Sequence, residues 1–237
     1  MGTLALDIET ASPHGKPRDF ENTDYFELVA VAVGYAASPD DEPETAVFLR
    51  EGGWEDEHTA DVLQTVLDWV GDRPVDRTLT YHGTGFDEIH LRNWASEVAE
   101  SGAWPEAEAE LDRLFAGHVD LAVHAGEAYQ DRLRGRATFP KLERLCRWED
   151  IDTGEVRYAE YDFHDGYLAG MGITDEVMQG RHIGVALGEA YVEGLENGLT
   201  GTATFQELER LLRDYATGDI VPLFELDALF GHPEPEE

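Results

Sequence analysis

The chain has 237 residues, which fits one globular domain with a sizeable core, and its single cysteine, Cys146, excludes an internal disulfide bond or a cysteine-based zinc cluster. Its 51 acidic and 17 basic residues give a formal net charge of −34. Because no apolar run is long enough to span a membrane and the N-terminus lacks the basic start of a signal peptide, we expect a cytoplasmic protein without a membrane contact.

The first half of the chain predicts a sheet with helices packed on it. Residues 3–9 alternate as in a strand, and apolar strands follow at 29–36 and 45–49. A helix is expected at 57–70 and a short strand at 78–81. Further elements are expected at 86–100 (helix), 105–116 (helix) and 119–121 (strand). Three strands followed by a helix, a strand and more helices indicate an α/β layer fold.

The second half is predicted to be mostly helical, with an irregular excursion at 151–165. Helical spacing is found at 139–148, 175–195 and 204–217. Gly218 and Pro222 predict that the last helix bends or restarts. We expect a single domain over residues 1–230 and a frayed acidic tail at 231–237.

The acidic residues are spread over the periodic segments rather than concentrated in one tail. This even distribution favours a surface adapted to molar salt, as in a halophilic archaeon, over a specific acidic function. Molar salt also weakens the contacts of lysine and arginine with phosphates, so the net charge does not exclude a nucleic-acid substrate.

One segment, residues 132–147, departs from the acidic trend. It holds six basic residues and one acidic residue, Glu143. Contact with the phosphates of a nucleic acid is one explanation, and ion pairs with nearby acidic segments are the other. The sequence favours neither. The candidate phosphate contacts in this segment are Arg132, Arg134, Arg136 and Lys141.

Two acidic side chains interrupt the first predicted strand. Strand alternation places Asp7 and Glu9 side by side on one face of an otherwise aliphatic segment. Two neighbouring carboxylates on a partly buried face repel each other and lose hydration, and a bound cation offsets both costs. A solvated edge strand is the alternative, but the apolar context favours metal binding.

Further carboxylates have less support when taken alone. Asp87 follows Phe86 just after a strand and a glycine-bearing turn, where an acid in the first helical turn also complements the helix dipole. Tyr215 and Asp219 extend the apolar stripe of the last helix at helical spacing, so both are expected to face inward. A tyrosine is ordinary in such a place, whereas an unpaired buried carboxylate is costly.

No competing catalytic pattern is present in the sequence. It has no Walker A loop, no G-x-G-x-x-G after a strand, no G-x-S-x-G elbow and no H-E-x-x-H motif. A cluster of four carboxylates would need cations to stay ionised. Paired Mg²⁺ or Mn²⁺ ions would in turn indicate phosphoryl-transfer chemistry.

The order of these motifs resembles the DEDD family of 3′–5′ exonucleases, which have the ribonuclease H-like fold. The motifs are Asp-x-Glu at 7–9, Phe-Asp at 86–87 and Tyr-x-x-x-Asp at 215–219. Tyr215 matches the tyrosine branch (DEDDy), because the histidine branch would have His where this chain has Asp214. Residues 81–87, YHGTGFD, are similar to the Y-N-G-x-x-F-D of the YprB-like group, with His82 in place of Asn.

The resemblance implies a metal-dependent 3′–5′ exonuclease with a mixed central β-sheet flanked by α-helices and two bound divalent ions, Mg²⁺ or Mn²⁺. Asp7, Glu9 and Asp219 would hold one ion, and Asp7 with Asp87 would hold the other. Tyr215 would position the attacking water. The residues expected near the terminal nucleotide are His82 and Phe86.

The expected substrate is single-stranded DNA or RNA with a free 3′ end, and the expected product is a nucleoside 5′-monophosphate. A structure-specific endonuclease on the same scaffold is one alternative. A catalytically silent nucleic-acid-binding module is another, which the complete set of four carboxylates disfavours.

Overall fold

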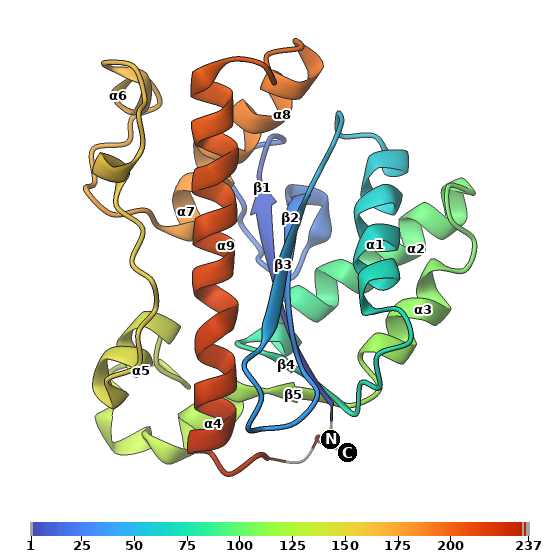
Figure 1. Ribbon diagram of the computed structural model, residues 1–237, viewed down its shortest axis with the longest axis vertical. Coiled ribbons are helices and arrows are strands. Elements are labelled where there is room, and N and C mark those ends of the chain that lie inside the picture. Colours follow the sequence, from blue (N-terminus) through green and yellow to red (C-terminus); the bar gives the residue numbers. More distant parts are fainter. Residues whose placement is uncertain (1, 234, 236–237) are drawn as a thin grey trace.

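The computed structural model describes residues 2–233 and 235, and a five-stranded sheet lies at its centre (Figure 1). The strands are β1 (Thr3–Ala11), β2 (Glu27–Ala36), β3 (Glu44–Leu49), β4 (Arg77–Thr80) and β5 (His118–Asp120). Their order across the sheet is β3-β2-β1-β4-β5. β2 is antiparallel to β1 and β3, whereas β4 is parallel to β1 and β5. The sheet is therefore mixed, with the first strand at its centre.

Helices cover both faces of the sheet (Figure 1). One face carries α1 (Asp56–Val70), α2 (Asp87–Ser101) and α3 (Ala107–Leu114). The other carries α4 (Leu121–Ala128), α5 (Leu142–Glu149), α8 (Gly188–Glu196) and the long α9 (Ala203–Leu229). The predicted architecture is confirmed: the chain has an α/β fold with a mixed central sheet flanked by helices.

Shorter helical segments fill the connections between these elements. Two are short α-helices, α6 (Tyr167–Gly170) and α7 (Gly180–His182). One is a π-helical turn, Ile183–Leu187, which runs from α7 into α8. The others are 3₁₀ turns at Thr23–Tyr25, Gly83–Gly85, Gln130–Arg132 and Tyr158–Glu160. The expected irregular excursion at 151–165 is confirmed, and the helix expected at 175–195 begins only at Gly180.

Side-chain alternation along β1 builds the two faces of the core. Leu4, Leu6 and Ile8 are buried in the apolar cluster beneath α1, α2 and α3. Ala5 is buried in the cluster beneath α9. Because successive side chains of a strand point to opposite faces, Asp7 and Glu9 share the face of Ala5. The predicted sorting of this strand is confirmed.

The sequence predicted that the last helix bends or restarts at Gly218 and Pro222, and the restart is wrong. α9 runs unbroken from Ala203 to Leu229 with Pro222 inside it. Gly218 instead allows a close approach, since a Cβ atom there would lie 2.8 Å from the carbonyl oxygen of Thr153. The glycine therefore accommodates the loop after α5 rather than a break in the helix.

The beginning of the expected C-terminal tail is bound to the body of the protein. The His232 ring contacts the Asp227 carboxylate at 2.8 Å, and Arg77 donates a hydrogen bond to the backbone carbonyl of Pro233 at 3.2 Å. The rest of the tail that was expected to fray lies largely outside the described residues, at positions 234, 236 and 237. Within the described part of the chain, no helix is both long enough and apolar enough to cross a membrane.

Candidate active site

Three carboxylates from opposite ends of the chain meet where β1 packs against α9. Asp7 and Glu9 come from β1, and Asp219 comes from α9. One oxygen atom of each side chain lies within 4.8 Å of the other two. The residues come together because α9 crosses the sheet face that Asp7 and Glu9 share (Figure 1).

Asp87 brings a fourth carboxylate to the same strand. It is the first residue of α2 and is only 4% exposed. Its Oδ1 atom accepts a hydrogen bond from the backbone N–H of Ile8 at 3.1 Å. Ile8 lies between Asp7 and Glu9, and the charge of Asp87 acts on both of them. The fold thus gathers all four acidic residues that the sequence singled out.

Burial and mutual repulsion raise the pKa values of this cluster. For Asp7 and Glu9, burial is the larger cause and repulsion by the neighbouring carboxylates adds to it, so both pKa values lie well above the ordinary range. Burial also raises the pKa of Asp87 to about 7 and that of Asp219 to about 7. No arginine ion pair among the described residues includes any of the four.

The donor set fits a hard divalent cation. Mg²⁺ and Mn²⁺ prefer carboxylate oxygens, and the three oxygens of Asp7, Glu9 and Asp219 are close enough to bind one ion together. A bound cation would also offset the desolvation and repulsion that burden these side chains. The residues present therefore suit the metal that the family resemblance implies.

Tyr215 lies one turn before Asp219 on α9. The pKa of its hydroxyl lies well above the ordinary value. Burial is the larger cause, and the negative charges of Asp219, Glu9 and Asp7 add to it. The hydroxyl therefore keeps its proton at neutral pH and is able to donate a hydrogen bond. A Cβ atom at Gly180 would lie 3.3 Å from the tyrosine oxygen, so glycine at this position leaves space beside the hydroxyl.

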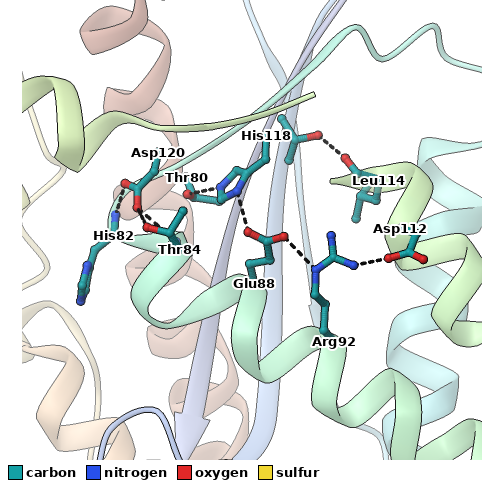
Figure 2. Close-up of polar contacts among 10 residues, drawn as sticks. Thr80, His82, Thr84, Glu88, Arg92, Asp112, Leu114, His118 and Asp120 are labelled. Atoms are coloured by element: carbon teal, nitrogen blue, oxygen red, sulfur yellow. Dashed lines mark hydrogen bonds and ion pairs between the residues drawn. The ribbon is translucent and has the colours of Figure 1, made fainter. Parts of the chain in front are cut away.

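The turn before Asp87 is held by Asp120, a residue that sequence reasoning missed. Asp120 accepts hydrogen bonds from the backbone N–H groups of His82 (2.7 Å) and Thr84 (3.1 Å) and from the Thr84 hydroxyl (2.5 Å; Figure 2). It also accepts the N–H of Ala122 and so caps α4. The available signal was an aspartate that ends a short strand at the start of a helix.

His82 has a left-handed backbone conformation, with φ at 70°. Among residues other than glycine, Asn, Asp and His adopt this conformation most readily. A histidine therefore suits the turn that leads into Asp87. Its ring lies 4.5 Å from that of Phe139. Both rings line a cavity whose lining also includes Gly85. Contact between His82 and a nucleotide stays a prediction.

A chain of polar contacts fixes the first turn of α2, and with it the fourth carboxylate. Glu88 contacts His118 of β5 and Arg92 of α2, both at 2.8 Å (Figure 2). His118 also forms a hydrogen bond with Thr80 of β4 at 2.8 Å, and Arg92 pairs with Asp112 of α3. These contacts connect α2 to the sheet on one side and to α3 on the other.

Phe86, expected near the terminal nucleotide, packs into the core. Its ring meets Phe26 edge-on at 5.3 Å and lies 4.4 Å from the ring of His90. It joins the apolar cluster beneath α1, α2 and α3. The structure therefore gives Phe86 a packing role, and its contact with a nucleotide stays a prediction.

The basic segment divides into parts with different surroundings. Arg132 lies over the rings of Tyr129 and Trp148, at 5.3 and 5.2 Å, and approaches Glu149 at 4.0 Å. The next two candidates, Arg134 and Arg136, are exposed in the loop before α5. Lys141 directly precedes α5 and lines a cavity beside the carboxylates. Of the four basic candidates, only Lys141 reaches that cavity.

This cavity has a volume of about 730 Å³ and includes Tyr215 and Asp219 in its lining. Its lining comes from α5, from residues 150–156 and 177–179, and from α9. The basic side chains in the lining are Lys141, Arg144 and Arg147. Sequence reasoning selected only the first of these as a candidate. Their three-residue spacing, which places them on one helix face, was the signal that could have found the other two.

No protein-family model and no curated protein matches the sequence. A family B DNA polymerase from the hyperthermophilic archaeon Pyrobaculum calidifontis is similar in structure, with a TM-score of 0.49 and 17% identity over 97% of this chain and 24% of the polymerase chain. A structure of exonuclease I has a TM-score of 0.43 and 15% identity over 64% of this chain and 36% of that one. The zinc-bound E. coli ExoI–ssDNA complex has a TM-score of 0.36 and 15% identity over 59% and 32%. The chain thus spans between 24% and 36% of the length of these three proteins.

Proposed function

We propose that the chain is a metal-dependent 3′–5′ exonuclease that hydrolyses phosphodiester bonds of single-stranded DNA or RNA and releases nucleoside 5′-monophosphates. One observation carries the proposal: Asp7, Glu9 and Asp219, from segments far apart in the sequence, place carboxylate oxygens within 4.8 Å of one another. Asp87 and Tyr215 lie beside them, which completes the residue set of the tyrosine branch of the DEDD exonucleases.

Within this proposal, Asp7, Glu9 and Asp219 hold one divalent ion, and Asp7 with Asp87 holds a second. Bound Mg²⁺ or Mn²⁺ supplies Lewis-acid stabilisation of the phosphoryl oxygens and lowers the pKa of a bound water. The carboxylates are suited to this role because burial raises their affinity for any positive partner, whether a proton or a metal ion.

The remaining roles belong to side chains around the carboxylates. Tyr215 keeps its proton and so donates a hydrogen bond that orients the attacking water. Asp120 acts as a positioning residue, since it fixes the turn that leads into Asp87. The cavity next to Tyr215 and Asp219 gives the substrate strand a path to the site.

An oligonucleotide assay tests the proposal. A 5′-labelled single strand, with either a free or a blocked 3′ end, is incubated with Mn²⁺ in molar KCl. We expect stepwise shortening of the free strand and none of the blocked strand. Asp219→Asn should slow shortening by more than about 100-fold, because changes to groups that merely support metal ligands already cost about 10–100-fold.

The matched control is Asp68→Asn, which makes the same change at an exposed position of α1 and should keep wild-type activity. Equal cleavage of blocked and free strands would show that the activity is endonucleolytic. Equal activity of Asp219→Asn and wild type would show that the proposed site is not the catalytic site. Binding of the oligonucleotide without any cleavage would favour the silent binding module.

A further inference from the structure

Basic side chains in this acidic protein are mostly paired already. Arg92 with Glu88 and Arg213 with Glu209 are typical examples. Within the described part of the chain, the basic side chains that form neither an ion pair nor a hydrogen bond are Lys16, Arg18, Arg134, Arg136, Lys141, Arg144 and Arg147. All but the first two lie within one short segment. With 51 acidic residues in the sequence, a cluster of unpaired cations points to an external anion.

The last three of these cations, which we call the α5 track, are Lys141, Arg144 and Arg147. They gather in one place because α5 is amphipathic. Its residues Leu145 and Cys146 are fully buried against the core beneath α9. The track residues are exposed and line the cavity that contains Tyr215 and Asp219. The track therefore lines the same cavity as two residues of the carboxylate site.

Acidic side chains also line the cavity but leave the track unpaired. They are Glu143, Asp150, Asp152, Glu155 and Asp219, and within the described part of the chain none of them forms an ion pair with the track. Glu155 pairs instead with Arg157. Because acidic side chains repel a polyanion and basic ones attract it, a phosphate chain in this cavity is drawn to the three cations of the track.

We propose that Lys141, Arg144 and Arg147 bind the backbone phosphates of single-stranded nucleic acid on the 5′ side of its terminal nucleotide. The inference rests on the proposed function, because this cavity adjoins the carboxylate site at Tyr215 and Asp219 and so gives the strand a path from it. Phosphate contacts carry no base information, so the track accepts any sequence. Arg134 and Arg136 do not line the cavity and take no part.

Two double variants that remove the same charge from the same segment test the proposal. Arg144→Gln/Arg147→Gln changes the α5 track, and Arg134→Gln/Arg136→Gln changes the exposed loop before it. All four side chains are exposed, so both variants should fold, which thermal unfolding checks. Binding of a fluorescent single-stranded oligonucleotide is followed by anisotropy in EDTA, where hydrolysis does not compete, over a series of KCl concentrations.

We expect the track variant to bind more weakly and to lower the slope of log Kd against log[KCl] by about 1.4, since each lost phosphate contact lowers it by about 0.7 for a single strand. The loop variant should keep the affinity and slope of the wild type. Equal losses in both variants, no loss in either, or a wild type that binds no oligonucleotide would overturn the proposal.

Hydrolysis separates this inference from the nuclease proposal. In Mn²⁺, the track variant should raise KM for a longer strand with little change in kcat. It should leave cleavage of a dinucleotide unchanged, because a dinucleotide has no phosphate upstream of the scissile bond. Loss of dinucleotide cleavage in the track variant would overturn the proposal, because these arginines would then act at the scissile phosphate itself. If the wild type cleaves neither substrate, the proposed function fails while the anisotropy result still decides the track.

Discussion

The fold disfavours the ionised form of the Asp87 carboxyl group. Burial raises its pKa to about 7, although the backbone N–H of Ile8 acts in the opposite direction. The N-terminus of α2 also favours the charged form, but it does not restore an ordinary pKa. At neutral pH the metal-free protein therefore holds a carboxylate whose ionisation costs stability, which is the expected property of a metal ligand.

Asp87→Asn should make the metal-free protein more stable at alkaline pH. The folded carboxyl binds its proton more tightly than the unfolded one, so the stability of the wild type should fall as the pH rises from about 4 through about 7. The variant lacks this group, so it should gain up to about 4 kcal/mol over the wild type at about pH 8. Urea unfolding in EDTA across this range measures the difference.

Asp68→Asn serves as the control for that profile, because Asp68 is exposed and should leave the pH dependence unchanged. Parallel profiles for Asp87→Asn and the wild type would mean that Asp87 ionises freely in the folded state.

Single residues differed in how far the sequence could predict them. The inward position of Asp7 and Asp219 followed from strand parity and helical spacing, which are local properties. Asp120 did not follow, because its importance comes from hydrogen bonds to a turn that precedes it by more than thirty residues. In a chain with 51 acidic residues, such an aspartate has no distinguishing local pattern.

At the scale of elements, α9 determines how the site is assembled. It packs against β1, β2, β3 and β4 and carries Tyr215 and Asp219. Close to Asp219, Gly218 lies against the carbonyl of Thr153, which belongs to a loop that lines the cavity. The same turn of the helix thus borders both the carboxylate cluster and the cavity.

Gly218→Ala should destabilise the protein despite the better helix propensity of alanine. Alanine alone would add about 1 kcal/mol in a helix. Its Cβ atom would lie 2.8 Å from the Thr153 carbonyl oxygen, however, so the loop must move at a cost of about 1–3 kcal/mol. The free energy of unfolding from denaturant titration measures the net effect.

Gly170→Ala in α6 is the matched control. A Cβ atom there meets nothing within 4 Å, so the substitution should be neutral or stabilising. A Gly218→Ala protein as stable as Gly170→Ala would show that the loop does not press on α9.

The elements of the first half were predicted nearly to their ends because their apolar periodicity is strong. β1, β2 and α1 begin and end within two residues of the expected bounds. The error at Gly218 arose because glycine and proline were interpreted by their local propensities, whereas Thr153 determines what position 218 must be. Contacts of this kind connect distant segments and leave no periodic signal.

At the scale of the whole molecule, the fold separates a cluster of carboxylates from a cluster of unpaired basic side chains. Four carboxylates converge at the centre of the sheet without a basic partner in the described part of the chain. The unpaired cations gather mainly in one segment that leads toward them. This separation of charge suits an enzyme that binds cations at one point and a polyanion along one path.

Mn²⁺ binding to the metal-free protein, followed by electron paramagnetic resonance in molar KCl, tests the central claim most directly, because it depends on no substrate. If the converging carboxylates form a metal site, the wild type and Asp68→Asn should bind Mn²⁺ saturably, and Asp7→Asn should lose this binding, since Asp7 is proposed to ligate both ions. Binding by Asp7→Asn as tight as that of the wild type would contradict the account.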